Sequence, residues 1–133
     1  MQPLEPGPIL VVDDDRTMAR LMRLALVRLG REIHGADNGE DALGLVEELR
    51  PSLLILDLNM PRRGGIEVLR TLARERARRR MAIIVVSAQG QPETADRALE
   101  AGADAFFRKP VILKELAQKA AALIQEVESA SPS

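Results

Sequence analysis

Short apolar runs alternate along this chain with longer segments of helical periodicity. The clearest runs are 9–12, 53–56 and 82–86, and weaker strand-like segments lie at 32–36 and 104–107. A short continuous apolar run is typical of a strand that is buried on both faces. Strands that alternate with helices predict an α/β fold, a doubly wound parallel sheet of five strands flanked by five helices.

The helical segments carry recognisable start and stop signals. Asp15 and Asn38 are good N-caps, Gly30 and Gly102 are good C-terminal stops, and Pro51 is a stop for the second helix. The expected helices lie between 15 and 30, from 38 to about 49, from 66 to about 77, from 92 to 101, and from 113 to about 127. We expect one domain over residues 8–128, with flexible tails at 1–7 and 129–133.

Composition excludes several classes of protein. With 19 Lys and Arg against 20 Asp and Glu, the net charge is -1, so charge gives no reason to expect a nucleic-acid partner. The chain has no Cys, Trp or Tyr and two Phe, which leaves no thiolate chemistry and little to stack on a flavin or a base. No apolar run approaches the roughly 20 residues that span a bilayer, and no signal peptide is evident. We therefore expect a cytoplasmic protein without a membrane partner.

Polar and charged side chains follow four of the five predicted strands. The run 13–15 is Asp-Asp-Asp, the third strand ends in Asp57, the fourth in Ser87, and the last runs into Lys109. The carboxyl ends of parallel strands share one edge of a sheet, which is where ligands bind in such folds. The sequence therefore predicts a site that combines several carboxylates, a hydroxyl and an ammonium group.

This set of groups indicates phosphoryl chemistry. Clustered carboxylates repel one another, and a hard divalent cation allows them to stay ionised together at neutral pH. Mg²⁺ suits the site better than Ca²⁺, because few side-chain ligands are offered and water or phosphate oxygens can complete an octahedron. An aspartate beside a metal ion and a lysine can act as the nucleophile and form an acyl phosphate.

Six short motifs along the chain match those of a known family. The motifs, in order, are Asp13-Asp14, Asp57-Leu-Asn-Met-Pro61, Gly65-Ile-Glu67, Ser87-Ala88, Ala101-Gly102-Ala103 and Lys109-Pro110. In this order and spacing, over roughly residues 8–128, the chain resembles the receiver domain of a two-component response regulator, specifically the single-domain, chemotaxis type. The resemblance implies a flavodoxin-like fold with strand order 2-1-3-4-5.

The resemblance also implies roles for the site residues. Asp57 would accept a phosphoryl group from the phosphohistidine of a sensor histidine kinase or a histidine phosphotransfer protein. Asp13, Asp14, Asp57 and the backbone carbonyl of Asn59 would hold Mg²⁺. Lys109 would pair with Asp57 at rest and with a phosphoryl oxygen afterwards.

Further implied roles concern switching and phosphate lifetime. Ser87 would donate a hydrogen bond to the phosphoryl group, and Phe106 stands at the family's aromatic switch position, where it lacks the hydroxyl of the usual Tyr. Asn59 and Gln89 would tune the lifetime of the phosphate. The Lys109–Pro110 peptide bond is expected to be cis.

Output is expected through one face of the domain. The resemblance assigns it to the fourth helix, the last strand and the last helix, including Leu99, Phe106, Arg108 and Lys119. Because we expect no second domain, this face would dock on a downstream protein or pair two copies in a homodimer.

Two other functions fit part of the pattern. The run from Asp13 to Thr17 also matches the Asp-x-Asp-x-Thr motif of haloacid-dehalogenase-type phosphatases, with Asp13 as nucleophile and Asp15 as acid/base. That interpretation leaves Asp57 idle and lacks the further acidic pair after Ser87 that those enzymes require. A receiver that acts as a phosphate-independent interaction module would usually have lost one of the key acidic residues or the lysine, and all are present. We therefore expect a signalling phosphoacceptor whose only catalysis is slow self-phosphorylation and dephosphorylation, not a metabolic enzyme.

Overall fold

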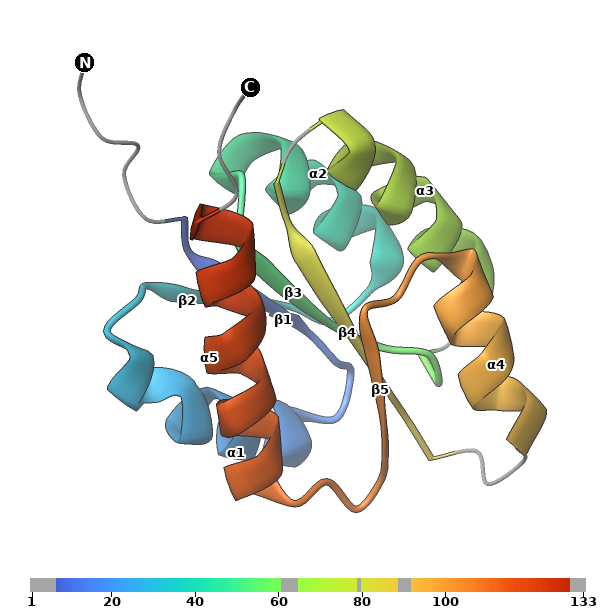
Figure 1. Cartoon of the computed structure of the whole chain (residues 1–133). Coiled ribbons are helices and arrows are strands. Elements are labelled where there is room, and N and C mark those ends of the chain that lie inside the picture. Colours follow the sequence, from blue (N-terminus) through green and yellow to red (C-terminus); the bar gives the residue numbers. More distant parts are fainter. Residues whose placement is uncertain (1–6, 61–64, 79, 89–91, 130–133) are drawn as a thin grey trace.

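Strands and helices alternate along the whole described part of the chain (Figure 1). The computed structural model describes residues 7–60, 65–78, 80–88 and 92–129. The strands are β1 (Ile9–Val12), β2 (Ile33–Ala36), β3 (Leu53–Asp57), β4 (Ala82–Ser87) and β5 (Ala105–Arg108). The helices are α1 (Arg16–Leu26), the short 3₁₀ turn η1 (Val27–Leu29), α2 (Gly39–Leu49), α3 (Gly65–Arg78), α4 (Pro92–Ala101) and α5 (Leu113–Ser129).

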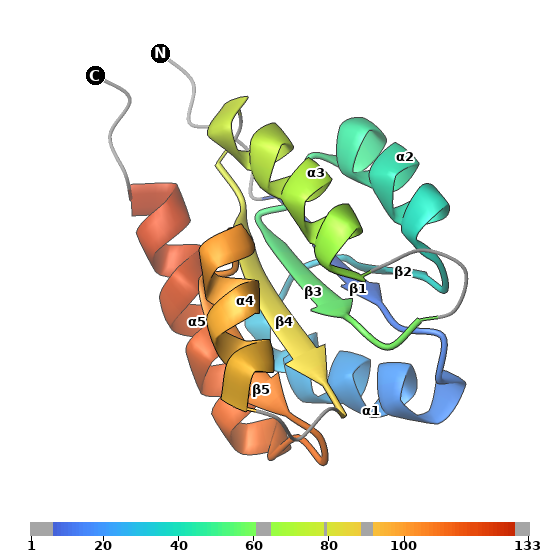
Figure 2. The ribbon, with the colours of Figure 1, turned by 90° about the vertical axis from the view of Figure 1, so that its right-hand side faces the viewer.

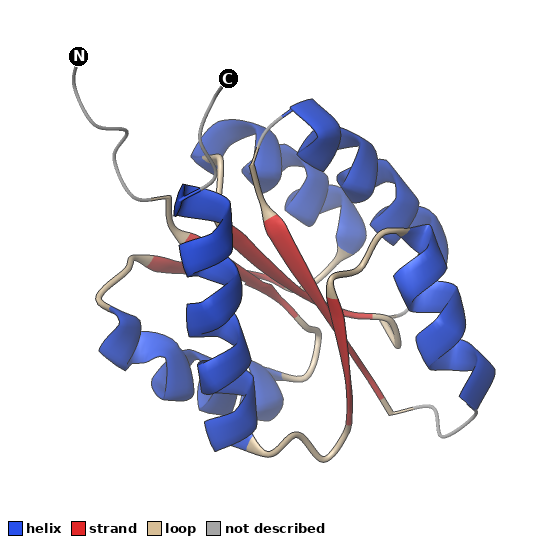
Figure 3. Ribbon diagram, viewed as in Figure 1, coloured by secondary structure: helices blue, strands red, loops and turns tan. Residues whose placement is uncertain are grey.

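The strands form one parallel sheet in the order β2-β1-β3-β4-β5. Helices α1 and α5 cover one face and α2, α3 and α4 cover the other, so the sheet is the middle of three layers (Figures 1 and 2). Figure 3, coloured by secondary structure, shows the strands enclosed between the two helical layers. The predicted doubly wound fold and strand order are confirmed.

The central strands are apolar throughout because both of their faces are covered. Every residue of β1, β3 and β4 is buried. Side chains alternate between faces: Leu10 and Leu54 pack with α2, α3 and α4, whereas Ile9 and Leu53 pack with α1 and α5. β3 pairs with β1 and β4 and is the central strand, so its last residue, Asp57, lies in the middle of the carboxyl edge of the sheet.

Local capping explains where the first two helices begin and end. The carboxylate of Asp15 accepts a hydrogen bond from the Met18 amide, and the Asn38 side chain caps α2 in the same way. Gly30 ends η1 in a left-handed conformation (φ 72°). α2 ends at Leu49, as predicted, and Arg50 follows it in a left-handed conformation (φ 51°) just before Pro51.

The C-terminal elements differ slightly from the sequence prediction. β5 runs from Ala105 to Arg108, one residue later than expected, because the carboxylate of Asp104 accepts a hydrogen bond from the Ile83 amide (2.8 Å) and stays outside the strand. α5 continues through Ser129, which the prediction had placed in the C-terminal tail. Of the predicted tails at 1–7 and 129–133, residues 1–6 and 130–133 lie outside the described residues, as does Gln89, whereas Gly7 is hydrogen-bonded to Ser52 and Arg31. Within the described ranges, no helix has the length and apolar character needed to cross a membrane.

Candidate functional site

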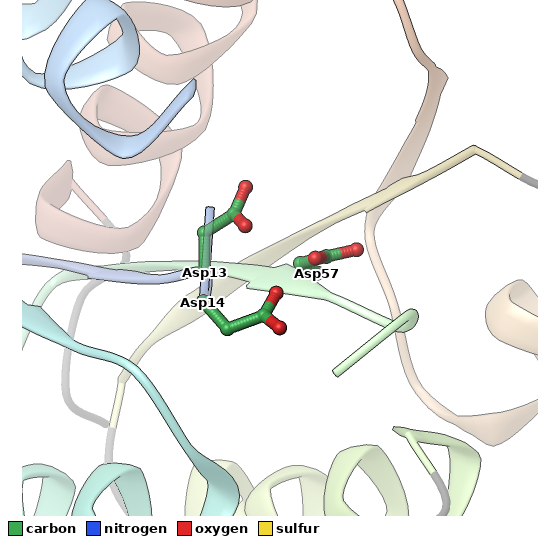
Figure 4. Close-up of side chains that lie close together, drawn as sticks. All are labelled: Asp13, Asp14 and Asp57. Atoms are coloured by element: carbon green, nitrogen blue, oxygen red, sulfur yellow. The ribbon is translucent and has the colours of Figure 1, made fainter. Parts of the chain in front are cut away.

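Three carboxylates meet beyond the ends of two neighbouring strands. Asp13 and Asp14 directly follow β1, and Asp57 is the last residue of β3, which pairs with β1 in parallel (Figure 4). One carboxylate oxygen from each residue lies within 4.8 Å of the others. Asp13 and Asp57 are 3% and 2% exposed, whereas Asp14 is open to solvent. The acidic cluster predicted from the strand ends is therefore present.

Backbone amides donate one hydrogen bond to each of the two buried carboxylates, whose other oxygens could bind a cation. Oδ1 of Asp13 accepts a hydrogen bond from the Asp15 amide, and Oδ1 of Asp57 accepts one from the Asn59 amide, each at 2.9 Å. Oδ2 of Asp13 is buried and accepts no regular hydrogen bond from the described residues, although it forms an ion pair with the ammonium of Lys109. Because clustered carboxylates repel one another, and hard divalent cations prefer oxygen ligands, the site fits Mg²⁺.

Lys109 brings a positive charge to the two buried carboxylates. Its Nζ lies 3.2 Å from Oδ2 of Asp13 and 3.4 Å from Oδ2 of Asp57. Partial burial lowers the pKa of the Lys109 ammonium, but the charges of Asp57 and Asp13 outweigh that effect, and the pKa rises above its usual value. Lys109 therefore stays protonated and bridges the two carboxylates.

Asp13 is harder to ionise than an ordinary aspartate. Burial raises its pKa to about 6, and the nearby charge of Asp57 adds to the increase. The hydrogen bond from the Asp15 amide and the charge of Lys109 act in the opposite direction without cancelling it. A bound divalent cation would relieve the same cost by stabilising the ionised form.

The end of β4 meets the site through Asn59. The hydroxyl of Ser87, a fully buried residue, donates a hydrogen bond to Oδ1 of Asn59 (3.0 Å), and the Ala88 amide donates to the same oxygen (2.7 Å). The sequence predicted Ser87 and Asn59 as site residues but not the contact between their side chains. The amide of Ala88 was missed altogether, because a backbone donor leaves no mark in the residue types.

The switch position and the proline bond follow the predicted pattern. Phe106 lies on β5, half-buried, and packs against the core cluster on the side of α2, α3 and α4. The Lys109–Pro110 peptide bond is cis, as the resemblance implied.

Comparison with known proteins assigns the family. The chain matches the response regulator receiver domain over residues 9–121, and it belongs to that family. It is 33% identical to the alkaline phosphatase synthesis transcriptional regulatory protein PhoP of Bacillus subtilis over 125 residues, which are 94% of this chain and 51% of PhoP. It is 37% identical to the response regulator MprA of Mycolicibacterium vanbaalenii over 120 residues, 90% of this chain and 51% of MprA. The chain thus spans about half the length of these relatives.

Solved structures agree with this assignment. A CheY-like response regulator receiver domain from Methanospirillum hungatei superposes with a TM-score of 0.86 at 28% identity, covering 96% of this chain and 100% of that one. The signal receiver domain of a putative LuxO repressor protein from Vibrio parahaemolyticus gives 0.85 at 25% identity, with 94% and 95% covered.

The protein is a receiver domain of phosphorylation-dependent two-component signalling. The phosphatase alternative is not favoured: Asp15, its required acid/base, is exposed and caps α1. The family is one of signalling phosphoacceptors that bind Mg²⁺ at an acidic cluster and interact with histidine kinases, and the acidic cluster is present here.

Proposed function

We propose that Asp57 is the phosphoacceptor of this receiver domain. One observation carries the proposal: Asp57 is a buried carboxylate at the end of the central strand, with Lys109 3.4 Å away and two further acids beside it. A carboxylate oxygen of Asp57 attacks the phosphorus of a phosphohistidine, the phosphorus–nitrogen bond breaks, and the released imidazole takes up a proton. The donor is a sensor histidine kinase or a histidine phosphotransfer protein.

Mg²⁺ is the cofactor of this transfer. Asp13, Asp14, Asp57 and the backbone carbonyl of Asn59 are its proposed protein ligands. When bound, the ion neutralises negative charge on the phosphoryl group and on the carboxylates. The clustered carboxylate oxygens of Asp13, Asp14 and Asp57 support this assignment.

Lys109 and Ser87 are the other proposed catalytic residues. Lys109 already contacts Asp57, so its ammonium is placed to pair with a phosphoryl oxygen once the carboxylate charge of Asp57 is used in the new bond. Ser87 ends the strand beside β3 and supplies a hydroxyl donor. Their catalysis is confined to slow self-phosphorylation and dephosphorylation, with Asn59 and Gln89 tuning the second step.

Output is proposed to occur through the α4-β5-α5 face. Phosphorylation adds about -1.5 to -2 charges at the edge of the sheet and shifts the population of two existing conformations. Phe106, half-buried on β5, would move between them by packing alone, since it has no hydroxyl. The face would then bind a downstream protein or a second copy of the chain.

The test is phosphorylation by a small-molecule donor. The chain is incubated with Mg²⁺ and acetyl phosphate and its intact mass is measured, together with that of Asp57→Asn and of Asp96→Asn, which changes an exposed aspartate on α4. We expect a phosphoryl adduct on the wild type and on Asp96→Asn, and none on Asp57→Asn. An adduct that persists in Asp57→Asn would refute the assignment of the phosphoacceptor.

A further inference from the structure

Asn59 is hydrogen-bonded to both halves of the site. Its backbone amide donates to Oδ1 of Asp57 at 2.9 Å, while Oδ1 of its own side chain accepts two hydrogen bonds from the end of β4. The residue is exposed, so these contacts are not a by-product of core packing. Asn59 therefore links the proposed phosphoacceptor at the end of β3 to the end of β4.

The two donors from β4 converge on a single oxygen atom. The Ser87 hydroxyl and the Ala88 amide approach Oδ1 of Asn59 at 3.0 and 2.7 Å. The register pairs Asp57 with Val86, the residue before Ser87, so this donor pair lies beside the Asp57 carboxylate. A hydroxyl and an amide that share one acceptor form a small cradle for an oxygen atom, and a neutral carboxamide oxygen fills it.

We propose that the Asn59 carboxamide is a latch that occupies the oxygen cradle of Ser87 and Ala88 until a phosphoryl oxygen on Asp57 displaces it. This inference rests on the proposed function, since it needs a phosphoryl group on Asp57. The exchange is favourable because an anionic phosphoryl oxygen is a stronger hydrogen-bond acceptor than a neutral amide oxygen. Phosphorylation of Asp57 must therefore compete with the hydrogen bonds that Asn59 accepts from Ser87 and Ala88 in the unphosphorylated protein.

Displacement of the latch would also reach the last strand. The backbone carbonyl of Ser87 accepts a hydrogen bond from the Lys109 amide (2.9 Å), so Ser87 links Asn59 to the residue that follows β5. Release of the Ser87 side chain from Asn59 therefore changes the restraints on β4 next to β5. This is a direct route from the phosphoacceptor to the proposed output face.

The test measures binding of a phosphoryl analogue to variants at position 59. Beryllofluoride with saturating Mg²⁺ is titrated into the wild type and Asn59→Ala, which keeps the backbone carbonyl proposed to hold the ion. Asn38→Ala is the matched control, because it removes another asparagine side chain that follows a strand but forms its hydrogen bonds with Asp37 and Asp41. Removing the competing acceptor should tighten beryllofluoride binding about two- to tenfold in Asn59→Ala, the effect of one ordinary hydrogen bond, and leave Asn38→Ala unchanged.

A second readout follows the Ala88 amide itself by NMR. In the free protein its proton resonance should move upfield in Asn59→Ala, because the acceptor at 2.7 Å is gone. In the wild type, beryllofluoride should shift the side-chain amide resonances of Asn59 as the carboxamide leaves the cradle. In a Ser87→Ala background, the increase in beryllofluoride affinity caused by Asn59→Ala should be smaller, because one of the two hydrogen bonds to the Asn59 carboxamide no longer exists.

The possible results separate the latch from the proposed function. Tighter binding by Asn59→Ala with the predicted amide shifts supports the latch. Equal or weaker binding by Asn59→Ala overturns the latch while leaving the phosphoacceptor assignment standing. Failure of the wild type and Asn59→Ala alike to bind beryllofluoride would contradict both proposals.

Discussion

The ammonium nitrogen of Lys109 lies 3.4 Å from Oδ2 of Asp57, although the two residues follow strands that are not neighbours in the sheet. Asp57 ends the central strand β3, and Lys109 comes one residue after the edge strand β5. The lysine side chain therefore reaches across the end of β4, and it also contacts Asp13 at 3.2 Å. In the absence of a metal ion, this single cation compensates two buried carboxylates.

Removing that cation should destabilise the metal-free protein. Lys109→Met keeps most of the aliphatic stem but leaves Asp13 and Asp57 without a positive partner. We expect a loss of about 1–3 kcal/mol in the free energy of unfolding at pH 7.5 in EDTA, measured by urea denaturation. The figure is below that for a fully buried pair, because the Lys109 side chain is 17% exposed.

Mg²⁺ should then stabilise Lys109→Met more than it stabilises the wild type, because the carboxylates attract the ion without competition from the ammonium. Lys119→Met, at an exposed position of α5, is the matched control and should behave like the wild type. Equal stability of Lys109→Met and Lys119→Met in EDTA would show that the lysine does not compensate the acidic cluster.

The raised pKa of Asp13 predicts how stability depends on pH. The folded protein holds the proton of Asp13 up to about pH 6, whereas the unfolded chain releases it near 3.8. The contribution of this group to stability is therefore fully present below pH 3.8 and is lost as the pH rises through 6. In EDTA at pH 7.5, Asp13→Asn should stabilise the protein by on the order of 2 kcal/mol, with little gain at pH 4.

The matched variant for this prediction is Asp14→Asn. Asp14 is exposed, so removing its carboxylate should weaken Mg²⁺ binding but should not stabilise the metal-free protein as Asp13→Asn does. Asp13→Asn should weaken Mg²⁺ binding as well. Urea denaturation of both variants at the two pH values, in EDTA and in Mg²⁺, tests the account; a loss of stability for Asp13→Asn at pH 7.5 in EDTA would refute it.

Two glycines should respond in opposite ways to alanine. Gly102 ends α4 with φ 124°, and a Cβ there would lie 2.4 Å from Cβ of Ala73, so Gly102→Ala should destabilise the protein by about 2 kcal/mol or more. Gly44 is exposed within α2, and a Cβ there meets nothing within 4 Å. Gly44→Ala should therefore stabilise the protein by about 0.5–1 kcal/mol. Thermal unfolding of both variants checks the pair, and a neutral Gly102→Ala would contradict the predicted clash.

The sheet and most of the acidic site could be predicted because their signals are local. The runs at 9–12, 53–56 and 82–86 are apolar enough to require burial on both faces, and parallel strands bring their carboxyl ends to one edge. The positions of Asp13 and Asp57 follow from that rule alone. The strand order and the individual roles required the family resemblance, because hydrophobic periodicity does not specify which strands are neighbours.

The remaining details depend on tertiary contacts. The one-residue shift of β5 arises from the Asp104 carboxylate binding the amide of Ile83, on the neighbouring strand β4. The position of the Asn59 carboxamide depends on a backbone donor at Ala88, and any residue except proline supplies one. The raised pKa of Asp13 reflects the burial of its carboxylate, which the neighbouring residues in the sequence do not reveal.

The most direct test of the account is chemical location of the phosphoryl group. The protein is phosphorylated with acetyl phosphate and Mg²⁺, and the acyl phosphate is reduced with borohydride, which converts a phosphorylated aspartate to homoserine. Peptide sequencing by mass spectrometry then identifies the position. We predict homoserine at position 57 alone; homoserine at position 13 with an intact Asp57 would contradict the phosphoacceptor assignment and restore the phosphatase-type mechanism.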